Sequence, residues 1–138
     1  MAVNETAEVS VGGEQMALHP SRPDGADKSP AIIVIQEIFG VNNNIKSIAE
    51  RFANEGYFAA APEMFHRSGS GIDIPFSEME KAFAERGKLS GDNIEDDVQA
   101  TIDYLKNNNL KKYEPIVLKK NEINYLKFND NKSIHGLG

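Results

Sequence analysis

The chain has 138 residues, of which 40% are hydrophobic and 26% charged, and this length suits one domain with an apolar core. Its 15 basic and 21 acidic side chains give a net charge of -6, which argues against binding of nucleic acid or of an anionic membrane through bulk charge. The chain has no cysteine, no apolar run near the roughly 20 residues of a membrane-spanning helix, and no signal-peptide pattern at its N-terminus. We therefore expect a cytoplasmic protein without disulfides or a thiol nucleophile.

The first predicted elements are short strands. The stretch "AEVSVGG" at 7–13 alternates weakly, and Gly12-Gly13 can turn the chain into a second strand that starts at residue 14. Pro20 is expected to end this second strand or to confine it to a sheet edge. After a loop rich in proline, glycine and aspartate, "AIIVIQ" at 31–36 is apolar without alternation. That pattern is typical of a strand buried on both faces of a parallel sheet.

A helix and another strand follow. Asn42 to Asn44 offer N-caps, and apolar residues then recur at helical spacing until Gly56, which suits a helix C-terminus. "YFAAAP" at 57–62 reads as a second buried strand that Pro62 ends. Strand, helix and strand within about 30 residues predict a right-handed βαβ unit.

Two further helices are predicted after a loop. Ser77 with Glu80 has capping-box spacing, and the helix it opens would turn Met79, Ala82 and Phe83 inward and end at Gly87. Asp92 with Glu95 repeats this spacing. The last helix carries one apolar stripe, formed by Ile94, Val98, Ile102 and Leu105.

The composition changes near residue 106. Residues 1–105 carry 8 basic and 18 acidic side chains, whereas residues 106–138 carry 7 basic and 3 acidic ones. Alanine occurs 13 times before residue 106 and never after it, and asparagine is concentrated in the last segment. We predict one α/β domain over residues 1–105 and an aberrant tail rich in lysine and asparagine over residues 106–138.

One carboxylate stands out in this α/β pattern. Glu37 directly follows the apolar strand at 31–36, and open α/β sheets bind ligands beyond the carboxyl ends of their strands. Glu37 is therefore a candidate for an active-site crevice. The structural alternative is an acidic residue placed before a helix because the helix dipole favours it there.

Two runs resemble one known family. "VIQEIFGVN" at the end of the apolar strand and "NEGYFAAAPEMFHR" after the helix resemble the dienelactone hydrolases, also called carboxymethylenebutenolidases. The resemblance covers roughly residues 7–109. It implies the N-terminal half of an α/β-hydrolase fold, with a mostly parallel sheet, flanking helices and an incomplete architecture.

The resemblance also implies an activity and site residues. Family members hydrolyse lactone and ester bonds of small molecules with a Cys-His-Asp triad and without a cofactor or metal. Glu37 matches the glutamate that holds the resting thiol, the backbone N–H of Ile38 matches an oxyanion donor, and Arg67 matches a cation that contacts the substrate carboxylate. A guanidinium suits a carboxylate because it can bind both oxygens, although Arg67 also reads as a solvated loop cation.

The nucleophile is missing from the pattern. The sequence contains neither G-x-C-x-G nor G-x-S-x-G, and the late His135 has no partner nucleophile. We therefore expect a hydrolase truncated or frame-shifted near residue 106, inactive by itself, whose exposed sheet edge would favour self-association. The alternative is a complete, non-catalytic module that binds a small ligand or a partner protein.

Other sites receive less support from the sequence. The histidines are far apart and none opens H-E-x-x-H, so no metal site is expected, and His66 is interpreted as solvated. The acidic run at 92–97 lacks the spacing of a calcium loop and is interpreted as a helix N-terminus. Aromatic residues among the tail lysines could stack on single-stranded nucleic acid, which we consider the weaker interpretation of a polar tail.

Overall fold

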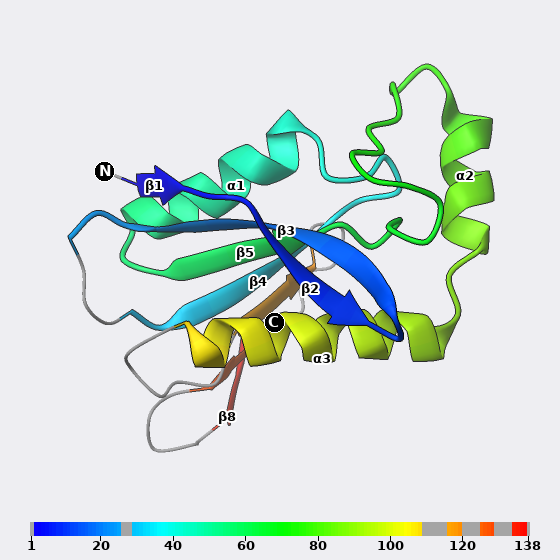
Figure 1. Ribbon diagram of the computed structural model, residues 1–138. Helices are drawn as coiled ribbons and strands as arrows, with labels where there is room; N and C mark the ends of the chain where they lie inside the picture. The colour runs from blue at the N-terminus through cyan, green and yellow to red at the C-terminus, as the bar shows by residue number, and fades with distance from the viewer. Residues whose placement is uncertain (1, 26–28, 109–115, 120–124, 129–133, 138) are drawn as a thin grey trace.

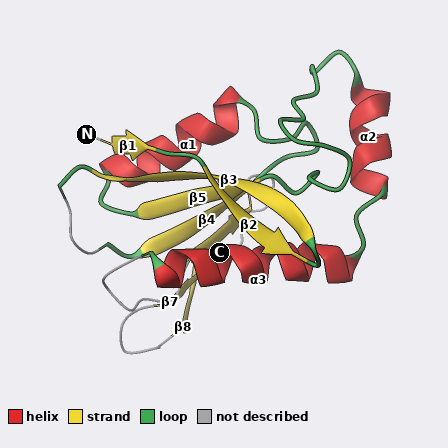
Figure 2. Cartoon of the chain, in the orientation of Figure 1, coloured by secondary structure: helices red, strands yellow, loops and turns green. Residues whose placement is uncertain are grey.

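The computed structural model describes residues 2–25, 29–108, 116–119, 125–128 and 134–137. In this part of the chain a β-sheet carries helices on both of its faces (Figures 1 and 2). The strands are β1 (Ala2–Asn4), β2 (Ala7–Val11), β3 (Glu14–Pro23), β4 (Ala31–Ile35), β5 (Phe58–Pro62), β6 (Ile116–Lys119), β7 (Tyr125–Phe128) and β8 (Ile134–Leu137). The helices are α1 (Asn43–Asn54), α2 (Met79–Gly87) and α3 (Gly91–Asn107).

The sheet is mixed. Its strand order is β1-β3-β5-β4-β6-β7-β8, and β2 also pairs with β3. Among the described residues only the pairs β4–β5 and β4–β6 are parallel, and the other five pairings are antiparallel. The prediction of a mostly parallel sheet is therefore wrong. The connections from β2 to β3, β6 to β7 and β7 to β8 span only a few residues, and a parallel crossover needs about a dozen or more.

The central strand β4 is buried on both faces, as predicted. Its side chains alternate between two apolar clusters, with Ile32 and Val34 packed under α1 and Ile33 packed against α3. Both of its edges are paired, in parallel, by β5 and β6. The sheet edge that was expected to stay exposed beside β4 is thus covered by β6. Strand β4 therefore offers no open edge for self-association.

Pro20 does not end β3, contrary to the prediction. Strand β3 lies inside the sheet, between β5 on one side and β1 and β2 on the other. The N–H and C=O of one strand residue point to the same neighbour, and the Pro20 carbonyl accepts from Glu5 N at 2.9 Å. The Pro20 nitrogen, which carries no hydrogen, therefore faces the gap between β1 and β2. No residue of either strand requires a donor there.

The helix predictions hold in part. The Asn42 side chain caps α1 by accepting from Ile45 N at 3.1 Å, and Gly56 follows its end with a φ of 100°. In α2 only Ala82 is buried. Met79 and Phe83 are 43% and 60% exposed, so the prediction that they point inward is wrong. Glu78, not Ser77, stands at the N-cap of α2.

The division of the chain after residue 105 stays a prediction. Helix α3, capped by the Ser90 side chain rather than by Asp92, continues to Asn107. Strand β6 joins the same sheet, with Ile32 opposite Ile116. Within the described residues, no helix combines the length and the apolar character needed to cross a membrane.

A first prediction concerns the packing of α3. Leu105 is fully buried in the cluster beneath α3, whereas Ile102 on the same helix is only partly buried. Leu105→Ala is expected to lower the free energy of unfolding by about 2–5 kcal/mol, and Ile102→Ala by less. Urea unfolding of both variants measures this. Equal costs for the two would contradict the assigned packing.

Candidate active site

The candidate site begins at the turn that follows β4. The Glu37 carbonyl accepts from Gly40 N at 3.2 Å and from Gln36 Nε2 at 3.1 Å. The Gln36 Oε1 atom accepts from Met64 N at 2.8 Å. One amide side chain therefore joins the turn to the segment that follows β5, and the carboxyl ends of the two parallel strands are linked.

Gly40 fits this turn because it has no side chain. Its φ is 93°, and a Cβ atom there would lie 2.2 Å from the Ile72 carbonyl oxygen. Next to it, Ile74 N donates to the Phe39 carbonyl at 2.9 Å. The backbone of 72–74 thus packs directly on the turn and fixes the position of Glu37.

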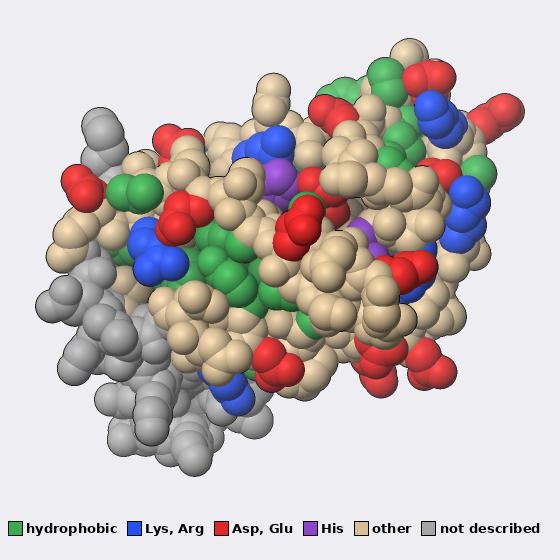
Figure 3. All heavy atoms as spheres, in the orientation of Figure 1, with side chains coloured by type: hydrophobic (Ala, Val, Ile, Leu, Met, Phe, Trp, Pro, Cys, Tyr) green, Lys and Arg blue, Asp and Glu red, His purple; other side chains and the backbone are tan. Residues whose placement is uncertain are grey.

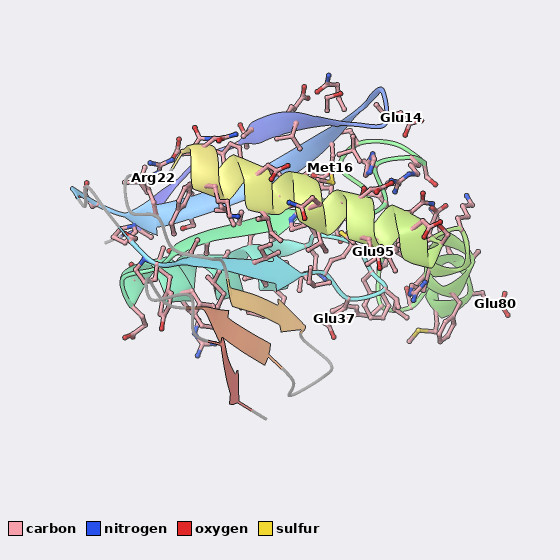
Figure 4. All side chains as sticks on the ribbon, turned by 90° about the horizontal axis from the view of Figure 1, so that it is seen from below. Glu14, Met16, Arg22, Glu37, Glu80 and Glu95 are labelled. Carbon is pink, nitrogen blue, oxygen red and sulfur yellow. The ribbon has the colours of Figure 1, made fainter. Side chains whose placement is uncertain are left out.

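Glu37 and Ile38 leave their polar groups available. The Glu37 side chain is half-buried and lies at the carboxyl end of β4, where Figure 4 labels it. Within the described residues its carboxylate makes no hydrogen bond or ion pair, and the Ile38 N–H makes no hydrogen bond. A carboxylate and a backbone donor therefore lie on adjacent residues of this turn, without partners in the described part of the chain.

Arg67 is held by a buried aspartate on α3. Its Nη1 donates to Asp97 Oδ2 at 3.0 Å and its Nη2 to Asp97 Oδ1 at 2.9 Å. Hydrogen bonding to Asp97 raises the pKa of Arg67 above its ordinary value, so the guanidinium stays charged. His66 Nε2 lies 3.0 Å from the same Oδ1, and the Asp97 side chain is fully buried.

Two interpretations of the sequence are wrong here. His66 is buried rather than solvated, and Asp97 is a core residue rather than part of a helix N-terminus. The buried residues of α3 are spaced four apart and are Asp97, Thr101 and Leu105. A charged residue on the buried face of an amphipathic helix requires a partner, and this is the signal the sequence offered.

A second buried carboxylate was also missed. Glu63 Oε2 lies 2.6 Å from His19 Nε2, and Glu63 Oε1 accepts from Gly71 N at 2.8 Å. This pair joins β3 to the loop after β5. In the part of the chain that the structure describes, no hydrogen bond or ion pair joins Glu37 to Arg67, so the predicted site residues lie on separate networks.

The fold indicates the class of protein. The α/β sheet with helices on both faces superposes on about half of several solved hydrolase chains. A Klebsiella pneumoniae protein assigned as a dienelactone hydrolase superposes with a TM-score of 0.75 at 27% identity, covering 86% of this chain and 50% of that one. A dienelactone hydrolase-like phosphotriesterase, P91, superposes with a TM-score of 0.69 at 19% identity and supports the fold alone.

The sequence comparisons show the family. The profile of the dienelactone hydrolase family matches residues 16–118, and this chain belongs to that family. A Synechocystis protein assigned as a carboxymethylenebutenolidase is 37% identical over 92 residues, which are 65% of this chain and 37% of that protein. An Escherichia coli K12 protein with the same assignment is 45% identical over 63 residues, 23% of its length. The chain thus matches well under half the length of these curated relatives.

The Asp97 network gives a second prediction. Asp97→Asn leaves Arg67 and His66 with a neutral partner in a buried site, so it is expected to lower the free energy of unfolding by about 3–5 kcal/mol. The neighbouring Asp96 is exposed, and Asp96→Asn is the matched control, with an expected change within about 0.5 kcal/mol. Thermal or urea unfolding measures both. Similar stabilities of the two variants would contradict a structural role for Asp97.

The Glu37 turn gives a third prediction. Gly40→Ala is expected to destabilise the protein by several kcal/mol, since the added Cβ meets a backbone carbonyl. Gly56 has a similar φ of 100° with nothing within 4 Å of its Cβ position, so Gly56→Ala should cost only the backbone strain of about 1–2 kcal/mol. Chemical unfolding of the two variants compares them. Equal losses would show that close approach at Gly40 is unimportant.

Proposed function

We propose that this chain provides the N-terminal part of a hydrolase that acts on lactone or ester bonds of small molecules. The observation that carries this proposal is the turn after β4, which presents the Glu37 carboxylate and the Ile38 N–H without partners among the described residues. Family membership supports the reaction class. The nucleophile, aspartate and histidine of the reaction would lie outside these residues.

Each site residue receives a role in this proposal. A nucleophile supplied from outside the chain would attack the carbonyl carbon, and the Ile38 N–H would donate to the developing oxyanion, where one such donor contributes about 3–4 kcal/mol. The C–O bond of the ester or lactone would then break, its oxygen would leave as an alcohol after protonation by the outside histidine, and water would hydrolyse the acyl intermediate to the acid. Glu37 would hold the resting nucleophile through its carboxylate, because a charge beside a nucleophile shifts its protonation.

Arg67 retains donors for a substrate carboxylate. A guanidinium has five N–H donors, and the two bonds to Asp97 use only two of them. The Arg67 side chain is 27% exposed, so part of it reaches solvent. Asp97 would hold the guanidinium plane in one orientation, and the remaining donors would meet the carboxylate of an acidic lactone.

A non-catalytic binding module is the second candidate. The pairing of β4 by both β5 and β6 favours it, because the central strand then needs no further chain to complete its hydrogen bonds. Saturable ligand binding without turnover by a cooperatively folded chain would support this candidate over the hydrolase.

Turnover gives the fourth prediction. The 138-residue chain should hydrolyse 4-nitrophenyl acetate no faster than buffer, because it contains no cysteine and no nucleophile elbow. A chimera of residues 1–118 with the C-terminal part of the Synechocystis relative should hydrolyse this ester. In the chimera, Glu37→Gln should shift the pH dependence of kcat/KM and change its value at neutral pH by about tenfold, because a neutral amide no longer influences the protonation of the nucleophile.

The control in the chimera is Glu55→Gln, which changes an exposed glutamate outside the site and should leave kcat/KM unaltered. Turnover by the native 138-residue chain would overturn the assignment of the nucleophile to an outside segment. A folded chimera whose kcat/KM keeps its value and its pH dependence after the Glu37→Gln substitution would overturn the role of Glu37.

A further inference from the structure

A cavity of about 440 Å³ lies away from the Glu37 turn. It is formed between α1, β3 and the connection from β1 to β2, and it shares no residue with the candidate active site. Its lining consists of Asn4, Glu5, Thr6, His19, Pro20, Ser21, Lys46 and Ala49. The volume falls within the range of small-molecule sites in proteins.

Most polar side chains of this lining are already satisfied by the protein. Ser21 donates to Asn4 at 2.6 Å, Asn4 donates to Glu50 at 3.0 Å, and Glu5 pairs with Arg22 at 2.7 Å. These groups form the wall, and the negative charge of Glu5 is balanced by Arg22. The capacity they retain is mainly that of acceptors, such as the second carboxylate oxygen of Glu5.

Three polar groups of the lining remain without partners among the described residues: the Lys46 ammonium, the Thr6 hydroxyl and His19 Nδ1. Lys46 and Thr6 are exposed. In Figure 3, histidine and basic side chains are visible on the face toward the viewer. The cavity therefore offers one cation, one hydroxyl and one imidazole nitrogen.

The imidazole of His19 is oriented by a buried carboxylate. Glu63, whose side chain is 10% exposed, lies 2.6 Å from His19 Nε2, so this ring nitrogen is already occupied by the carboxylate. Glu63 is itself fixed by the Gly71 N–H at 2.8 Å. Nδ1 is thus the ring nitrogen left for the cavity. A carboxylate often orients a functional histidine in this way, and the proposed hydrolysis gives His19 no role.

We propose that this cavity binds a small 2-hydroxy carboxylate. The Lys46 ammonium matches the carboxylate through a charge-assisted bond. The hydroxyl matches His19 Nδ1 in either protonation state, because a hydroxyl both donates and accepts. Pro20 and Ala49 complete the lining, and both side chains are almost fully buried.

Mandelate is a suitable probe, because it combines a carboxylate, a neighbouring hydroxyl and an apolar ring. Titration of the full 138-residue chain, followed by amide and imidazole NMR shifts, should give saturable changes at Thr6, His19 and Lys46 in the millimolar range. Phenylacetate lacks the hydroxyl and mandelamide lacks the carboxylate, so both should bind at least several-fold more weakly.

Matched variants separate the site from bulk charge. Lys46→Gln removes an exposed cation of the lining and should weaken mandelate binding about tenfold, the effect of losing one charge-assisted bond. Arg51→Gln removes an exposed cation from the same helix outside the cavity and should leave binding unchanged. His19→Gln should abolish the preference for mandelate over phenylacetate.

Two results would overturn the proposal. One is the absence of saturable shifts at tens of millimolar mandelate, and the other is equal binding by the Lys46→Gln and Arg51→Gln variants. Neither result bears on ester hydrolysis, since the cavity shares no residue with the Glu37 turn.

Discussion

The rest of this structure depends on the interaction of the Asp97 carboxylate, fully buried on α3, with Arg67 and His66. Two guanidinium nitrogens of Arg67 and one imidazole nitrogen of His66 lie within 3.0 Å of its oxygens. A buried charge without such partners costs several kcal/mol, so α3 can dock on the sheet only if the segment after β5 adopts this conformation. Docking of the helix and folding of that segment are therefore one event.

The same segment supports the acidic turn. Met64 N binds the Gln36 side chain, which in turn binds the Glu37 carbonyl, and the 72–74 backbone packs on Gly40. Contacts made within this chain alone therefore hold the Glu37 carboxylate and the Ile38 N–H in place. In the proposed reaction the chain would contribute electrostatic groups to catalysis and leave covalent chemistry to residues outside it. A pre-formed turn of this kind costs no reorganisation when a reacting carbonyl arrives.

The local features were predictable from the sequence, and the long-range ones were not. The uninterrupted apolar run of β4 and the cap at Asn42 follow from chemistry within a few residues, and Glu37 at the end of β4 follows from them. The spacing of Asp97 on α3 indicated that it could be buried, but its partner His66 could not be predicted, because it lies about 30 residues away in the chain, beyond the reach of periodicity and capping signals. The antiparallel β2–β3 hairpin was predictable from Gly12-Gly13, but the antiparallel pairing of β3 with β5 was not, because these strands are far apart in the sequence.

The central claim is that these residues supply one part of a lactone or ester hydrolase whose nucleophile is encoded elsewhere. Sequencing the encoding DNA from codon 90 to several hundred bases past codon 138, with translation in all three frames, tests it most directly. We expect a frame that carries G-x-C-x-G after the β6 region, followed by an aspartate and a histidine. Closed frames throughout would contradict the claim and leave the Glu37 turn to a binding module.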